Sequence, residues 1–407
     1  MAKSIHQGGL KVRHLIILLS FLGFSAQTLS TQESYSKELL DLKKRFSTIE
    51  AKALAEEFRG IQVTNGKQEG LFPVRTTGVS TKPIAEAATA YLNLLSPQEL
   101  TRSQFASDSL EWRRWFNVDN GIYVRQGLSL KEMTTQQRAA AKKILELSLS
   151  AKGLALSKDI MKTDQTLSEL NSSAFLDEQL YYITIMGIPS ESEPWGWQLD
   201  GHHLVINYFI QGDQVVMTPA FFGAEPAIAQ SGKYKGNQVL QEEQNEALKF
   251  VQSLSEAHQK LAILERRKPA DNMLAGAHKD NLILDYAGLP ANKLNADDKE
   301  KLLGIIRLFV NNLKEGHAKI RMEAVQKHLD DTWFAWVGDT KDNSVFYYRI
   351  HSPVILIEFD HQRPIGTRML HTPGKPTRDH IHVIVRTPNG NDYGKDLMGQ
   401  HLAEHHH

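Results

Sequence analysis

Two β-rich blocks in an otherwise helical sequence constrain the fold more than any other feature. The first block covers about residues 179–219 and the second about residues 332–387. Each consists of short apolar runs separated by turn residues, such as Gly212-Asp213 in the first block, and this pattern predicts antiparallel hairpins. Neither block alternates strands with helices, as a parallel α/β sheet requires. The sequence therefore predicts an α+β fold.

Helical periodicity fills most of the remaining chain. Residues 35–171 contain several apolar stripes at helical spacing. Between the two β-rich blocks we expect one long helix over about residues 239–267 and another over about 295–314, with Asn295 as its N-cap.

These elements predict one α+β domain over residues 33–404. Its helical part, about residues 33–175, forms an N-terminal layer. The layer packs on an antiparallel sheet built from the two β-rich blocks of the mixed part, about residues 176–404.

A basic, then apolar, then small-residue pattern stands near the N-terminus. Lys11 and Arg13 precede an apolar run over residues 15–24, and Ser25 follows it. The run is shorter than the roughly 20 residues of a membrane-spanning helix and is typical of a secretory signal. We therefore predict a signal peptide over residues 1–26, export to the periplasm or the exterior, and no stable membrane span after its removal.

Composition narrows the possible chemistry. The chain has no cysteine, which excludes disulfides and thiolate metal sites. Its 47 basic residues equal its 47 acidic residues, so charge gives no reason to expect a nucleic-acid partner. There are 17 histidines, but His405 to His407 form a terminal run that we exclude from any site. A metal site would therefore use nitrogen and oxygen ligands.

The last predicted strand carries a His-x-His pattern. His380 and His382 share one face of that strand and can bind a single metal ion. Glu358 and Asp360 share one face of the preceding strand. If the two strands are neighbours, Glu358 or Asp360 lies near the histidines, as a ligand or as an acceptor that orients a ring.

Two further positions complete the candidate site. His202 and His203 open a strand of the first block and are expected to point to opposite faces, so only one of them joins the site directly. Asp392, after the His-x-His strand, can orient a histidine or act as a general acid or base, although a turn or helix-cap role is the favoured alternative. Histidines that only form hydrogen bonds in the core or at the surface remain the alternative for the whole constellation.

Three sequence blocks together resemble a known family. They are "WGWQLDGHHLVINYFIQGDQVVMTPAFFGAEPA", "FYYRIHSPVILIEFD" and "HIHVIVRTPNGNDYGKDL". Over roughly residues 85–402 the chain resembles the uncharacterised bacterial family known as domain of unknown function 3500 (DUF3500), whose members are often exported. The resemblance implies a shared fold and places the candidate residues His202, His203, Glu358, His380 and His382 in motif blocks. It implies no reaction.

The sequence thus predicts an exported metal-dependent enzyme, with hydrolysis of an unknown small molecule as the first hypothesis. His380, His382 and either His202 or His203 would be ligands, with Glu358 as the fourth ligand or the base. An open position on Zn²⁺ would lower the pKa of a bound water to about 7. A copper or non-haem iron oxidoreductase is one alternative. A non-catalytic periplasmic metal- or ligand-binding protein is the other.

Overall fold

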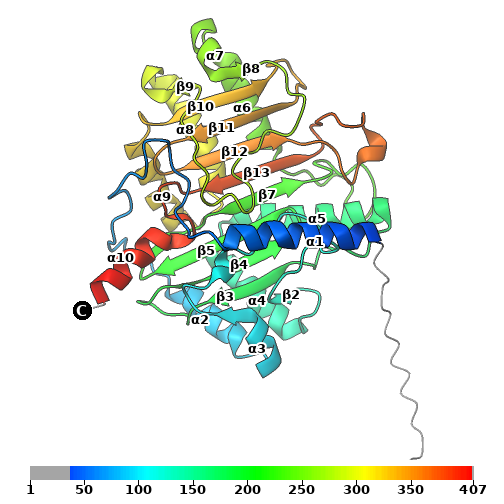
Figure 1. Cartoon of the computed structure of the whole chain (residues 1–407), viewed down its shortest axis with the longest axis vertical. Helices are drawn as coiled ribbons and strands as arrows, with labels where there is room; N and C mark the ends of the chain where they lie inside the picture. Colours follow the sequence, from blue (N-terminus) through cyan, green and yellow to red (C-terminus); the bar gives the residue numbers. More distant parts are fainter. Residues whose placement is uncertain (1–36, 406–407) are drawn as a thin grey trace, which may run out of the picture.

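The computed structural model describes residues 37–405 (Figure 1). The predicted signal peptide, residues 1–26, lies outside the described residues. No helix within residues 37–405 combines the length and the apolar character needed to cross a bilayer. The helices of the described part are α1 Lys37–Leu54, α2 Lys82–Leu92, α3 Pro97–Ser103, α4 Thr135–Ser148, α5 Ala151–Asn171, α6 Gln241–Ser253, α7 Glu256–Ala262, α8 Ala296–Val310, α9 Glu315–Lys327 and α10 Lys395–His405.

The strands form one large mixed sheet in the order β1-β3-β4-β5-β7-β13-β12-β11-β10-β8, with β2, β6 and β9 paired to β3, β5 and β10. Their bounds are β1 Gln104–Phe105, β2 Leu128–Ser129, β3 Tyr182–Met186, β4 Trp195–Gly201, β5 Leu204–Gln211, β6 Gln214–Val216, β7 Ala220–Ala224, β8 Ile263–Glu265, β9 Leu289–Pro290, β10 Trp333–Gly338, β11 Phe346–His351, β12 Leu356–His361 and β13 Ile381–Arg386.

The two β-rich blocks join where β7 pairs antiparallel with β13. The α+β prediction is confirmed, and within each block neighbouring strands are antiparallel. At its margins the sheet gains two parallel pairs that the sequence did not predict, β1–β3 and β8–β10. These marginal strands come from segments outside the two blocks, where short apolar runs next to helices gave no separate strand signal.

The two faces of the sheet carry cores of different size. The larger core packs the sheet against helices that include α2, α4, α5, α6 and α8. The smaller core lies on the other face, under irregular segments and α10, and Figure 1 views the sheet from this side, with α1 and α10 in front of the strands. Strand alternation decides the face: Ile381, Val383 and Val385 point to the larger core and Ile384 to the smaller one, as predicted.

The helix predicted over residues 239–267 is two helices. The backbone turns to an extended conformation at Leu254, and Ser255 then caps α7 by accepting a hydrogen bond from the N–H of His258. A serine side chain competes for backbone N–H groups, so it favours a new helix start over continuation. After α7 the chain forms β8. The helix predicted from Asn295 is confirmed as α8, with Asn295 as its N-cap.

Candidate metal site

Three histidines from two places in the sequence meet on the face of the sheet that carries the smaller core. His203 lies in the two-residue turn between β4 and β5, with a left-handed backbone (φ 59°). His380 directly precedes β13, and His382 is the second residue of that strand. Because β5 and β13 both pair with β7, the turn and the start of β13 become neighbours.

Gly223 of β7 makes this approach possible. It lies opposite His382 in the strand register and donates its N–H to the carbonyl oxygen of His203 at 2.7 Å. A Cβ at this position would lie 3.1 Å from Cδ2 of His203 and 2.9 Å from the carbonyl oxygen of Ile381. A larger residue would therefore displace the His203 ring or the strand.

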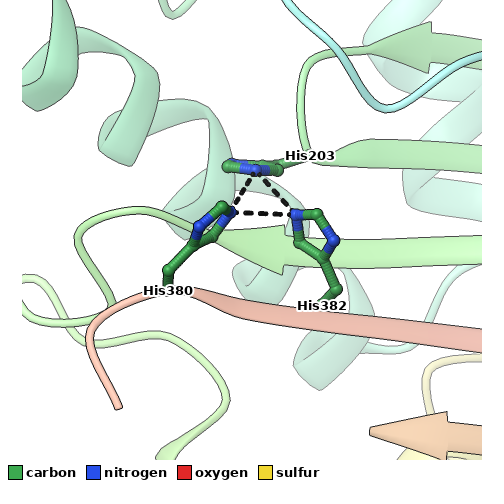
Figure 2. Close-up of side chains that lie close together, drawn as sticks. All are labelled: His203, His380 and His382. Carbon is green, nitrogen blue, oxygen red and sulfur yellow. Dashed lines mark hydrogen bonds between the residues drawn. The ribbon is translucent and has the colours of Figure 1, made fainter. Parts of the chain in front are cut away.

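The three rings converge through their Nε2 atoms. The His380–His382, His203–His382 and His203–His380 separations between these atoms are 3.0, 3.2 and 3.3 Å. Figure 2 shows one nitrogen of each ring turned toward the other two. His203 and His380 are buried, with exposed fractions of 2 % and 3 %, whereas His382 is partly exposed. The group is therefore reached from the side of His382.

The tautomer of His380 is set by its backbone partner. Its Nδ1 lies 2.7 Å from the carbonyl oxygen of Arg363, which can only accept, so Nδ1 donates the hydrogen bond. In a neutral ring, Nε2 then presents its lone pair to the other two histidines. The buried carboxylate of Glu225 lies 3.6 Å from the same Nδ1 and is held by the N–H and hydroxyl of Thr367. Such outer partners orient metal-binding histidines.

Burial keeps two of the rings neutral. The pKa values of His203 and His382 both lie well below the ordinary value of 6.5. Burial is the main cause, and the neighbouring histidines lower these pKa values further. Neutral imidazole is the form that binds a metal. These two rings therefore do not have to lose a proton at neutral pH before they can act as ligands.

His202 faces a different partner. Its Nδ1 lies 2.6 Å from the carboxylate of Asp164 on α5, and the hydroxyl of Tyr181 donates to the same carboxylate at 2.6 Å. Burial opposes a charge on His202, but the charge and hydrogen bond of Asp164 outweigh it and raise the pKa of the ring. The rings of His202 and His203 stack with centroids 3.9 Å apart. The expectation that they point to opposite faces is wrong, because they form the hairpin turn and strand alternation does not apply there.

The structure does not bring Glu358 to the three rings. Its carboxylate accepts hydrogen bonds from the Tyr347 hydroxyl at 2.6 Å and from the backbone N–H groups of Leu274 and Ala275. The strands β12 and β13 are neighbours, as predicted, but Asp360 rather than Glu358 lies opposite His382 in the register. The carboxylate of Asp360 forms an ion pair with Lys268 at 2.6 Å. Both carboxylates thus hold the segment around residues 268–275 against the sheet.

Asp392 also lies apart from the histidines. It accepts the backbone N–H of Thr387 at 2.7 Å and binds Nη1 of Arg386 at 3.0 Å. Arg386 in turn binds Asp280 at 2.9 Å. Asp392 thus closes the turn after β13 and neutralises a buried arginine, which agrees with the turn role that the sequence favoured.

The sequence did not predict the roles of three residues around the site. Asp164 is one acidic residue within a long amphipathic helix and carries no local signal. Both other residues belong to the "FFGAEP" segment, with Gly223 in β7 and Glu225 directly after this strand. A glycine followed by an acidic residue at a strand end is the signal that could have pointed to them.

The comparison with protein families supports the resemblance read from the sequence. The family model described as "Protein of unknown function (DUF3500)" matches residues 77–395. The chain belongs to the DUF3500 family. The match covers all the residues of the histidine group discussed above. Neither a search of curated proteins nor a search of solved structures found a match.

Proposed function

We propose that His203, His380 and His382 bind one divalent transition-metal ion, zinc first, and that the bound ion makes this protein a hydrolase of small molecules. Residues 1–26 would direct it to the periplasm or the exterior. Glu358 and Asp392 are not part of this proposed site, because other groups of the protein already bind their carboxylates.

The mutual approach of three Nε2 atoms carries the proposal. A hydrogen bond needs one donor and one acceptor, and a given Nε2 atom is either protonated or not. With three atoms, at least two must therefore have the same role, so the three short contacts cannot all be hydrogen bonds. A metal ion resolves the conflict, because all three nitrogens then turn lone pairs toward one cation.

The size of the triangle fits such an ion. Zn–N bonds of about 2.0–2.1 Å in tetrahedral geometry place ligand nitrogens about 3.3–3.4 Å apart. The observed separations of 3.0–3.3 Å are close to this spacing. Three protein ligands leave one position of a tetrahedron for water or substrate.

The surrounding residues favour chemistry on the side of His382. When bound, zinc would lower the pKa of a water ligand to about 7 and supply hydroxide. The Phe221 ring packs edge-on against His382 with centroids 5.0 Å apart and gives this side an apolar wall. The carbonyl oxygen of Arg363 holds His380 in the tautomer that leaves its Nε2 free to act as a ligand.

Hydrolysis is tested on a chain ending at Glu404, stripped of metal and reloaded with zinc. We expect the loaded protein to cleave at least one member of a panel of nitrophenyl esters, phosphates and amides, and the His382→Ala variant to lose this activity. His258→Ala removes a histidine outside the triangle and serves as the control. The hydrolase proposal is rejected if the protein binds zinc but cleaves none of the substrates faster than the His382→Ala variant does.

Two observations support alternative functions for the histidine site. The triangle contains imidazoles alone, and such a donor set also suits copper or iron, so an oxidoreductase is the alternative within enzymes. Two of the three rings are almost fully buried, which suits a protein that binds a metal without turnover. The first alternative is tested by reloading the protein with copper or iron and assaying oxidation of phenolic substrates, which an oxidoreductase would catalyse. Tight metal binding with no activity in any assay supports the second.

A further inference from the structure

A second unusual feature lies at the opposite end of β13 from the histidines. Arg321 of α9 donates through Nη2 to the carbonyl oxygen of Val354 at 2.6 Å and to Oγ1 of Thr387 at 3.0 Å. Within residues 37–405, no carboxylate forms an ion pair with this guanidinium. Burial lowers the pKa of Arg321 and the charge of Asp392 raises it, but the Asp392 carboxylate forms its hydrogen bonds with Arg386 and with the N–H of Thr387. Arg321 thus has no carboxylate in direct contact among the described residues.

Arg321 is partly buried, so its charge is only partly hydrated. Burial lowers the pKa of Arg321 to about 10, so the group stays charged at neutral pH in a site that disfavours charge. In the described part of the chain the Nε and Nη1 atoms of Arg321 have no hydrogen-bond partner, so they are available to a ligand in the cavities that Arg321 lines.

Arg321 stands between two adjoining cavities. The outer cavity has a volume of about 270 Å³ and is lined by the basic residues Arg75 and Lys327 and by the acidic residue Glu323. The inner cavity, about 40 Å³, is lined mainly by apolar side chains, among them Phe309, Leu313, Ile355 and Val385. Arg321 lines both.

A pair of hydroxyl groups extends the polar junction. Thr218 and Thr387 line the inner cavity, and their Oγ1 atoms are 2.7 Å apart. Only one hydroxyl can donate in this contact, and Thr387 already accepts from Arg321. The threonine hydroxyl that accepts in this contact keeps its own proton, which is available to an acceptor in the cavity.

We propose that the two cavities bind a short aliphatic carboxylate, with its carboxylate on Arg321 and the threonine pair and its alkyl tail in the inner cavity. A guanidinium donates charge-assisted hydrogen bonds to a carboxylate, here from Nη1 or Nε, because Nη2 already donates to Val354 and Thr387. One water needs about 10–15 Å³ on this volume scale, so the inner cavity of about 40 Å³ accommodates roughly three heavy atoms. This size selects acids of about four to six carbons over long-chain fatty acids. The site is separate from the histidines and does not depend on their function.

The test is calorimetric titration with pentanoate, 1-pentanol and inorganic phosphate. We expect pentanoate to bind at one site per chain, and pentanol and phosphate to bind at least about tenfold more weakly. Arg321→Met should weaken pentanoate by at least about tenfold, since it removes a charge-assisted contact. Lys319→Met, an exposed cation on the same helix, is the matched control and should bind like the original protein.

The opposite results would overturn the proposal. They are no pentanoate binding at millimolar concentration, equal binding by Arg321→Met, or phosphate binding as tightly as pentanoate. If Arg321→Met fails to fold by circular dichroism, Arg321→Lys and Thr218→Val take its place, each expected to weaken pentanoate while leaving pentanol unchanged. Decanoate that binds more tightly than pentanoate would contradict the assigned size. Pentanoate binding should persist in the His380→Ala/His382→Ala variant.

Discussion

Strand β13 carries two polar side chains on the same face of the sheet, the buried Arg386 and the partly exposed His382, and their polar atoms are satisfied in opposite ways. Around Arg386 the protein supplies every counter-charge: Nη1 binds Asp280 and Asp392 at 2.9 and 3.0 Å, and Nε donates to the carbonyl oxygen of Ala275 at 2.7 Å. Around His382, the Nε2 atoms of the three histidines face only one another. The first cluster is complete without a ligand, whereas the proposed cation would complete the second.

The largest expected effect breaks the complete cluster. Arg386→Met leaves Asp280 and Asp392 buried without their shared partner and should lower the free energy of unfolding by about 3–5 kcal/mol. Urea unfolding followed by circular dichroism measures this. Arg363→Met removes an exposed ion pair with Asp271 and should cost at most about 1 kcal/mol. Equal costs for the two variants would show that the Arg386 cluster is not structural.

The histidine cluster should respond in the opposite way. In metal-free protein, His382→Ala should change the unfolding free energy by less than about 1 kcal/mol, because the ring is partly exposed and its nitrogen contacts conflict. Zinc at about 100 times its dissociation constant should stabilise the original protein by about 2.7 kcal/mol and leave the variant unchanged. Thermal unfolding with and without zinc provides the measurement. Stabilisation of both proteins to the same extent would contradict the site.

The buried His351 lies outside both clusters and makes the stability of the protein depend on pH. Burial, followed by the charge of Arg349, lowers the pKa of His351 to about 3. The unfolded chain, with a pKa near 6.5, binds a proton that the folded state excludes, so stability falls as the pH falls below about 6.5. Relative to His351→Phe, the original protein should lose about 2 kcal/mol between about pH 7 and about pH 5. Parallel urea curves at the two pH values test this, and a constant difference between the proteins would refute it.

The smallest effect concerns the packing around the site. Gly223→Ala places a methyl group 3.1 Å from the His203 ring and should weaken zinc binding by about tenfold. Gly304→Ala, in α8 with open space around its Cβ, is the control and should raise stability by about 0.5–1 kcal/mol without altering zinc affinity. Competition with a zinc-sensitive dye measures both. Unchanged affinity in Gly223→Ala would mean that Gly223 does not position His203.

Strand alternation carried much of the sequence argument. It placed His380 and His382 together and assigned the faces of β12 and β13, because both strands are regular. It failed at His202 and His203, since a two-residue turn breaks the alternation that the argument assumed. It also suggested Glu358 as a partner, because a shared face does not reveal which backbone N–H groups approach from a distant loop. The Asp164–His202 pair and the unpaired Arg321 depend on contacts between remote segments, which no local pattern encodes.

The metal content of a chain ending at Glu404 tests the central claim most directly. After incubation with excess zinc and removal of the unbound ion, the account predicts one zinc per chain in the original protein and in His258→Ala, and none in the His380→Ala/His382→Ala variant. Cobalt in place of zinc should give the intense visible absorption of a tetrahedral site. Zinc well below one per chain in the original protein, or the same content in the double variant, would contradict the three-histidine site.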